Sequence, residues 1–193
     1  MQSSRFEVSA TYVAAVQRLL SAVAPALELD GPTRFALERP YARRWHPGAV
    51  ALSVHAQLVR HAGDEALVDF ERRLVVEGLA PMFRPAARVV YAHTRWPAEA
   101  LLASVPVAAW LAVRGVLVDW DARASALTIR YPEPVDEVLA SGAWRGAVRG
   151  LFELVGLEGP PLAWRFQQSA LTLLLHSVSP PPTDFVAERQ ARR

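Results

Sequence analysis

This sequence of 193 residues contains neither cysteine nor lysine. Without thiols there is no disulfide, no zinc–thiolate or iron–sulfur ligation and no cysteine nucleophile. Without lysine there is no Schiff base and no lysine-containing phosphate loop. The lack of cysteine is compatible with a reducing compartment, and we expect a cytoplasmic protein.

Long hydrophobic runs are also missing. The longest apolar stretch, residues 101–113, is too short to span a bilayer and contains Pro106. Residues 1–8 lack the apolar region of a signal peptide. We therefore expect no membrane span.

The charge is nearly balanced. The formal net charge is +2, and all 21 basic residues are arginines, scattered singly or in pairs between acids. A nucleic-acid-binding protein usually concentrates its positive charge in a patch. The charge pattern therefore argues against nucleic acid as a partner.

Local catalytic motifs are absent as well. The sequence contains no GxSxG, GxGxxG, P-loop or HExxH motif. Its five histidines form no cluster, and His55 and His61 are six residues apart, so they do not share one helix face. Asp119 and Asp121 would share a strand face, but they lie where a turn is expected to begin. We predict no catalytic residues, no metal site and no cofactor.

What the sequence does contain is helical periodicity, which fills its first two thirds. The apolar spacing predicts helices over residues 9–24, from Pro47 to 62, from a cap at Asp64 to 77, and over 86–94. Another helix is expected from Trp96-Pro97 to 114, with a kink or break at Pro106. Residues 25–44 are interrupted by proline and glycine, and they predict a connector with at most short turns.

The pattern changes after Gly115. VLVDW and ALTIRY predict a β-hairpin, and YPEP (131–134) separates it from a helix over about 136–155. Gly142, Gly146 and Gly150 recur every four residues, which we interpret as a close approach of this helix to a sheet. Two more strands are expected around QQSA (167–170).

These elements predict an α+β fold, in which an N-terminal helical layer precedes a β-β-α-β-β antiparallel sheet with one face covered by helices. We expect one compact domain over residues 1–179. The proline-rich, polar tail over 180–193 is expected to be loosely attached.

The order of five short motifs resembles a myxobacterial family of paralogues of unknown function and, distantly, the 4-vinyl-reductase and haem–nitric-oxide-binding small-molecule domains. The resemblance covers about residues 6–178 and implies an α+β regulatory or sensory module. Family members often have cysteines near the C-terminal strands, and this chain has none. The motifs are Trp45-His46-Pro47, Pro97-Ala98-Glu99-Ala100-Leu101-Leu102, Trp110 with Gly115, Tyr131-Pro132-Glu133-Pro134 and Gly156.

A candidate ligand pocket is suggested by the tryptophans and other aromatic residues, which line an apolar cavity or fill the core. We place this pocket between the helical layer and the sheet. Its aromatic side chains would stack on a ligand, while Arg95 or Arg130 would pair with an anionic group. The candidate ligand-binding residues are Trp45, Tyr91, His93, Arg95, Trp96, Trp110, Arg130 and Tyr131.

We therefore expect a non-enzymatic regulatory, sensory or protein-interaction module that self-associates, as a homodimer, or binds another protein. A small apolar or anionic molecule is its candidate ligand. The alternative is an enzyme with a non-local acid–histidine site, such as His93 with Asp119 or Glu133. A weak nucleic-acid binder is the second alternative.

Overall fold

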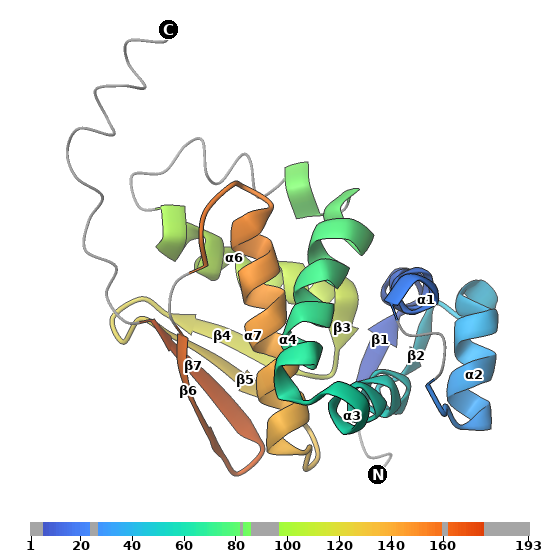
Figure 1. The fold of residues 1–193 in the computed structure, drawn as a ribbon. Coiled ribbons are helices and arrows are strands. Elements are labelled where there is room, and N and C mark those ends of the chain that lie inside the picture. The colour runs from blue at the N-terminus through green and yellow to red at the C-terminus, as the bar shows by residue number, and fades with distance from the viewer. Residues whose placement is uncertain (1–5, 24–26, 82, 86–96, 160–161, 176–193) are drawn as a thin grey trace, which may run out of the picture.

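The protein has an α+β fold with a largely helical N-terminal half and two antiparallel sheets (Figure 1). The computed structural model describes residues 6–23, 27–81, 83–85, 97–159 and 162–175. The helix predicted over 86–94 and the tail over 180–193 lie outside these residues. Within the described part of the chain, no helix is long and apolar enough to cross a membrane.

The N-terminal half is helical because apolar residues recur on one face of each segment. In the first helix, for example, Val13, Val16 and Leu20 are all buried. The helices of this half are α1 (Ala10–Val23), α2 (Gly31–Glu38), α3 (Ala49–Ala62) and α4 (Asp64–Arg73), which continues into the π-helical segment Leu74–Gly78.

Helix α2 corrects the prediction that residues 25–44 form only a connector. The side chain of Asp30 caps this helix, since its Oδ1 accepts a hydrogen bond from Thr33 N at 2.7 Å, and Pro32 lies in the first turn. Asp30 Oδ2 also accepts a hydrogen bond from Ser53 Oγ of α3 at 2.9 Å. The proline and glycine that indicated a loop therefore belong to the start of a helix.

A small sheet that the sequence did not predict joins three distant segments. Its strand order is β2-β1-β3, with β1 (Glu7–Ser9) between β2 (Trp45–Pro47) and β3 (Val113–Arg114). Pro47 therefore ends a strand, and α3 begins two residues later than predicted. Asp64 is likewise the first residue of α4, and Gly63, with φ of +81°, takes the capping position.

The larger sheet confirms the predicted β-β-α-β-β order. It contains β4 (Leu117–Asp121), β5 (Ala126–Arg130), β6 (Leu162–Gln167) and β7 (Ala170–Leu175) in the order β4-β5-β7-β6, with every pair antiparallel. One face carries the buried side chains of its central strands, Leu127, Ile129, Leu171 and Leu173.

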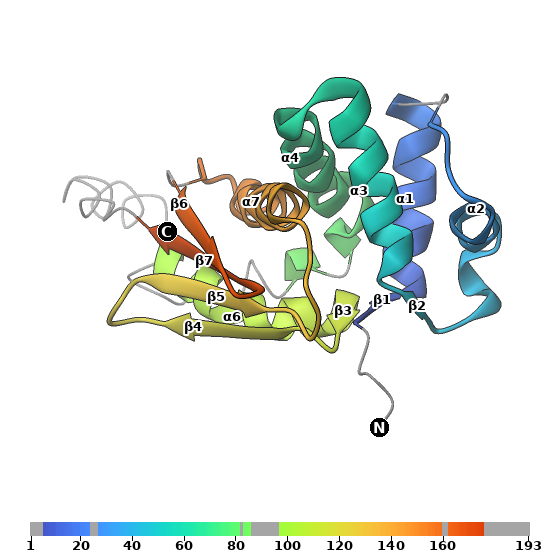
Figure 2. The same cartoon turned by 90° about the horizontal axis from the view of Figure 1, so that it is seen from below.

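Helices α6 (Pro97–Ala112) and α7 (Glu137–Glu153) cover this face (Figure 2). Leu101, Leu102 and Val105 of α6 are buried, and the helix continues through Pro106 without a break. The predicted helical cover is therefore present on this face.

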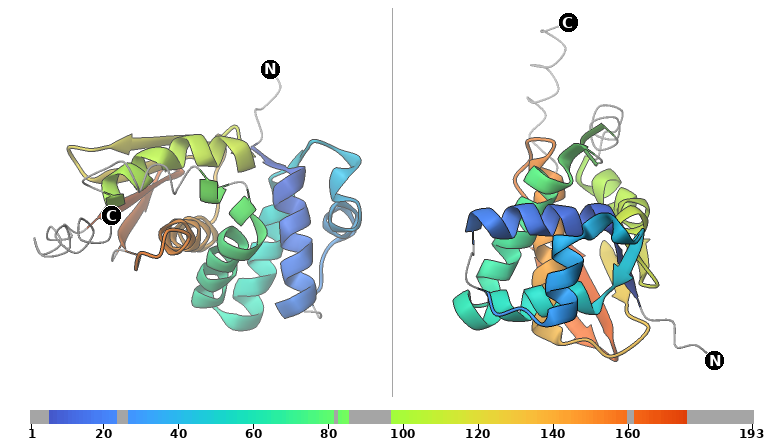
Figure 3. Two further views of the ribbon diagram at one scale, coloured as in Figure 1. Left: turned by 90° about the horizontal axis from the view of Figure 1, so that it is seen from above. Right: turned by 90° about the vertical axis from the view of Figure 1, so that its right-hand side faces the viewer.

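Helix α7 lies between the sheet and α4 (Figures 2 and 3), and its glycine stripe faces α4. A Cβ atom on Gly146 would lie 2.3 Å from the carbonyl oxygen of Val68, and one on Gly150 would lie 2.7 Å from that of Arg72. The predicted close approach is therefore correct, but its partner is a helix and not the sheet.

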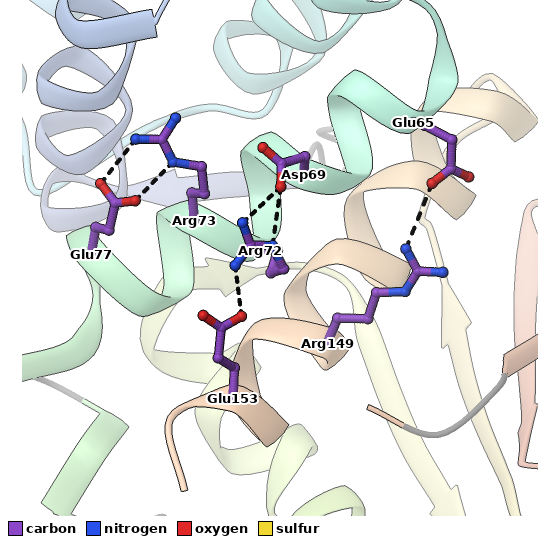
Figure 4. Close-up of polar contacts among 7 residues, drawn as sticks. All are labelled: Glu65, Asp69, Arg72, Arg73, Glu77, Arg149 and Glu153. Atoms are coloured by element: carbon purple, nitrogen blue, oxygen red, sulfur yellow. Dashed lines mark hydrogen bonds and ion pairs between the residues drawn. The ribbon is translucent and has the colours of Figure 1, made fainter. Parts of the chain in front are cut away.

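Ion pairs bridge the same two helices at the surface (Figure 4). Arg72 of α4 donates to Asp69 at 2.7 Å and to Glu153 of α7 at 2.6 Å. Arg149 of α7 lies 3.6 Å from Glu65. Exposed pairs of this kind contribute only about 0–1 kcal/mol each, so the glycine contact sets the distance between the helices.

Candidate functional site

A largely apolar cavity of about 110 Å³ lies where the N-terminal helices meet α6 and α7. Its walls come from β1, α1, α3, α4, the π-helical segment, α6 and α7, and most of its lining side chains are Val, Leu, Ala or Phe. Among the described residues that line it, only five carry a polar group in the side chain: Tyr12, His55, Glu71, Tyr131 and Trp144.

Three of these residues form a buried hydrogen-bonded cluster, Tyr12–His55–Glu71. The hydroxyl of Tyr12 donates to Glu71 Oε1 at 2.7 Å, and His55 Nε2 lies 2.6 Å from the same oxygen. Tyr12 is 7% exposed, His55 5% and Glu71 4%. Each residue comes from a different helix, so the cluster exists only in the folded protein.

The cluster leaves one nitrogen of His55 unused. Because Glu71 Oε1 accepts a hydrogen bond from Tyr12, we assign it as the acceptor for His55 too, which places a proton on Nε2. The other ring nitrogen, Nδ1, is buried and has no hydrogen-bond partner among the described residues, although buried polar atoms are usually satisfied.

The π-helical segment keeps α4 facing the cavity over more than two turns. Glu71, Val75 and Leu79 all line the cavity, although they are four residues apart. In a regular α-helix, eight residues overshoot two turns by roughly 80°. The wider π turn, closed by a hydrogen bond from Leu79 N to Leu74 O at 2.9 Å, brings Leu79 back to the same face. Such π segments are frequent at functional sites.

Tyr131 is a second polar group of the cavity. Its hydroxyl accepts a hydrogen bond from Trp144 Nε1 at 2.9 Å, and its ring packs edge-on against Phe6 with the centroids 5.5 Å apart. No acceptor for the hydroxyl proton of Tyr131 is found among the described residues. This hydroxyl can therefore donate one more hydrogen bond.

Both tyrosines stay protonated through neutral pH. Burial raises the pKa of Tyr12 well above its usual value, and the nearby charge of Glu71 raises that pKa further. Burial also raises the pKa of Tyr131, with a smaller contribution from Glu71. Each hydroxyl is thus available as a neutral hydrogen-bond donor.

The structure brings one of the eight predicted site residues, Tyr131, to this cavity. Trp45 is half-buried in β2 beneath the guanidinium of Arg114, Trp110 is 69% exposed on α6, and Arg130 is exposed at the end of β5. These three do not line the cavity. Tyr91, His93, Arg95 and Trp96 lie outside the described residues.

The sequence analysis did not select Tyr12, His55 or Glu71. A signal was nevertheless present, because each occupies a core position of an apolar helix face. Glu71 falls between Leu67 and Leu74, which are fully buried, whereas the other acids of α4 lie on its exposed side. A carboxylate at a core position needs a partner.

Other acids and histidines of the described residues give no comparable site. Within that part of the chain, no group of three or more His, Asp or Glu side chains could hold a metal ion. Asp121 Oδ1 accepts hydrogen bonds from the backbone nitrogens of Arg123 (2.8 Å) and Ala124 (3.2 Å), which is the role expected in a turn.

Comparisons of the chain with protein-family models, with curated proteins and with solved structures gave no match. The resemblance described from the sequence motifs therefore stays a prediction.

Proposed function

We propose that this protein is a non-enzymatic sensory or regulatory module that binds a small, uncharged and mostly apolar molecule in the cavity. The observation that carries the proposal is an apolar cavity lined in part by a buried polar cluster, Tyr12–His55–Glu71. Self-association or a protein partner for such a module stays a prediction.

The size of the cavity limits the ligand. An engineered protein cavity of about 150 Å³ holds benzene, and this cavity has about 110 Å³. A ligand of about six or seven non-hydrogen atoms is therefore the upper limit. Haem and drug-sized molecules, which occupy pockets of about 300 Å³ or more, are too large.

The charge of the wall favours a neutral ligand over the anionic one expected from Arg95 or Arg130. Glu71 is an acid on the described wall, and no arginine lies there. An anion would be placed near this carboxylate in a medium of low dielectric constant, where like charges repel strongly.

The polar cluster also supports a ligand because stability alone does not account for it. Replacing buried ionic or polar groups with well-packed apolar residues is often neutral or stabilising. A histidine, a glutamate and a tyrosine in this core therefore suggest a role in recognition.

Two alanine-to-leucine substitutions on α6 test the proposal. Ala108 lines the cavity, whereas Ala103 is exposed on the same helix. We expect Ala108→Leu to fill the cavity and abolish a small-molecule adduct that native mass spectrometry detects on the purified protein. Ala103→Leu should retain the adduct.

Circular dichroism should show that both variants are folded. An adduct that survives in Ala108→Leu would place the ligand elsewhere. If the wild-type protein carries no adduct and no small neutral molecule raises its melting temperature, the cavity is a packing defect and the proposal fails.

Proton-transfer catalysis is a second candidate, favoured by the contact between His55 Nε2 and Glu71. A histidine held through one nitrogen by a carboxylate, with the other nitrogen free, is the arrangement of a general base. The described wall contains no Ser, Thr or Lys nucleophile, so we expect proton abstraction only. Deuterium uptake by cyclohexanone in heavy water, lost in His55→Phe, would support this candidate, and uptake at the uncatalysed rate would exclude it for such ketones.

A further inference from the structure

The outer face of α6 is apolar and exposed. Val107 is 68% exposed, Trp110 69% and Leu111 40%, whereas Leu101, on the side of the helix that faces the core, is fully buried. Neighbouring apolar side chains that stay exposed together mark interaction sites. Tryptophan in particular is enriched among the residues that contribute most to protein–protein binding.

The exposed positions of this face have the spacing of a helix–helix contact. Ala103, Val107 and Trp110 follow one another at intervals of four and three residues, which is the repeat of the contact positions in a coiled coil. Glu99, four residues before Ala103, is also exposed, and so is Arg114, four residues after Trp110 and just beyond the end of the helix. We call these five residues the α6 stripe.

The α6 stripe is complementary to itself when a second copy of the helix lies antiparallel to it. A twofold axis between residues 106 and 107 places Trp110 of each copy opposite Ala103 of the other, so the bulkiest side chain of the stripe meets the smallest. The same axis places Glu99 of each copy opposite Arg114 of the other, and these opposite charges attract. A parallel pair would instead bring Glu99 toward Glu99.

We propose that the protein forms a homodimer in which the two copies pack through antiparallel α6 stripes. A bilayer matches this face less well, because an anionic membrane surface repels the carboxylate of Glu99. The inference is independent of the proposed ligand, since none of the five residues of the stripe lines the cavity.

The size of the stripe predicts a weak dimer. Helix α6 has 16 residues, and a helix of that length is about 24 Å long and about 10 Å wide. This face is smaller than the roughly 800 Å² that each partner buries in a standard interface. We therefore expect a dissociation constant in the micromolar range.

Sedimentation equilibrium of the full chain over a series of concentrations tests the association. Trp110→Glu should weaken the dimer by at least about ten-fold, as the loss of a central aromatic contact predicts. Tyr41→Glu is the matched control, because Tyr41 is 74% exposed but lies outside α6, and it should leave the dimer unchanged. Both substitutions are at exposed positions, and circular dichroism should show that both variants are folded.

The lack of cysteine in the chain makes the orientation of the two helices directly testable. In Val107→Cys the two thiols lie beside the axis, offset by only about 1.5 Å along the helices, so mild oxidation should link the two copies. In Ala103→Cys the offset is about 10 Å, beyond the Cα separation of about 7 Å that a disulfide allows, and no link should form. A parallel dimer would link through both.

A protein that stays monomeric at its highest soluble concentration would overturn the proposal. A dimer that Trp110→Glu and Tyr41→Glu affect equally, or that does not link through Val107→Cys, would place the interface on another surface and overturn it too. Linking through both cysteines would overturn the antiparallel arrangement. Binding of a monomeric protein to vesicles of phosphatidylcholine and phosphatidylserine, lost in Trp110→Glu, would assign the α6 stripe to a membrane instead.

Discussion

At the scale of single residues, the unusual feature is a set of polar groups placed at core positions. Tyr12, His55 and Glu71 satisfy one another with one oxygen as the common acceptor, yet one imidazole nitrogen remains unpaired. The cluster is thus incomplete at one atom, which no other described residue satisfies.

Because the chain has no lysine or cysteine, no other type of side chain is expected to titrate in the pH range where tyrosine does. Between about pH 9 and 12 the tyrosines are the only side chains of this protein that are expected to titrate. The pKa values of Tyr12 and Tyr131 are raised in the folded state. The folded protein therefore retains protons that the unfolded chain loses above about pH 10.

It follows that the stability contributed by these protons is fully present below about pH 10 and is lost as pH rises toward the folded-state pKa values. We expect the free energy of unfolding to fall above this pH by up to about 1.4 kcal/mol per pH unit for each buried tyrosine. Urea denaturation from pH 8 to 11.5 measures this slope.

The variants Tyr12→Phe and Tyr131→Phe should each reduce this slope by the contribution of one proton, about 1.4 kcal/mol per pH unit. Tyr41, which is 74% exposed, provides the matched surface control through Tyr41→Phe. The pH dependence of the free energy of unfolding is compared, and not its value at one pH, because Tyr12→Phe also loses a hydrogen bond at neutral pH. A wild-type slope retained in both core variants would contradict the burial of these hydroxyls.

At the scale of elements, the contact between α4 and α7 determines where Glu71 lies. A Cβ atom on Gly146 would meet the carbonyl oxygen of Val68 at 2.3 Å and Glu71 Cβ at 2.7 Å. Glycine at this position therefore supports the polar cluster without contacting a ligand.

The substitution Gly146→Ala should force the two helices apart. Although alanine favours a helix by about 1 kcal/mol over glycine, overpacking typically costs about 1–3 kcal/mol. We expect a net loss of free energy of unfolding and weaker ligand binding, measured by urea denaturation and calorimetry. Gly31→Ala is the control, because no atom lies within 4 Å of its added Cβ. Unchanged stability in Gly146→Ala would mean that the helices do not pack this closely.

The sequence predicted those elements whose signal is local. The spacing of Val13, Val16 and Leu20 and the alternation in ALTIRY each depend on neighbouring residues, and α1 and β5 were confirmed within a residue or two. Helix α2 was missed because glycine and proline occur both in loops and at helix starts. The three-stranded sheet was missed because its strands are two or three residues long and separated widely in the chain.

The candidate site was predictable only in part, for a similar reason. Tyr131 was selected as one of the aromatic residues expected between the helical layer and the sheet. The cluster depends on three helices that bring together residues 12, 55 and 71. The periodicity within one helix does not indicate that a histidine on α3 forms a hydrogen bond with a glutamate on α4.

At the scale of the whole molecule, the cavity lies where the two parts of the fold meet. Its wall includes residues from β1, from the N-terminal helices and from α6 and α7, which cover the sheet. A ligand there would contact helices from both parts at once. Binding would therefore stabilise the arrangement of these parts, which is how a small molecule could control a surface distant from the cavity.

The π-helical segment of α4 bears on what a single-residue deletion would do to this helix. An α-helix acquires a turn of this kind when it contains one residue more than its regular geometry accommodates. Loss of a single codon between Leu74 and Leu79 would leave Leu79 seven residues after Glu71, roughly 20° short of two turns of a regular α-helix, so Leu79 would still face the cavity. The π-helical turn therefore accommodates one extra residue while the helix keeps the same face toward the cavity.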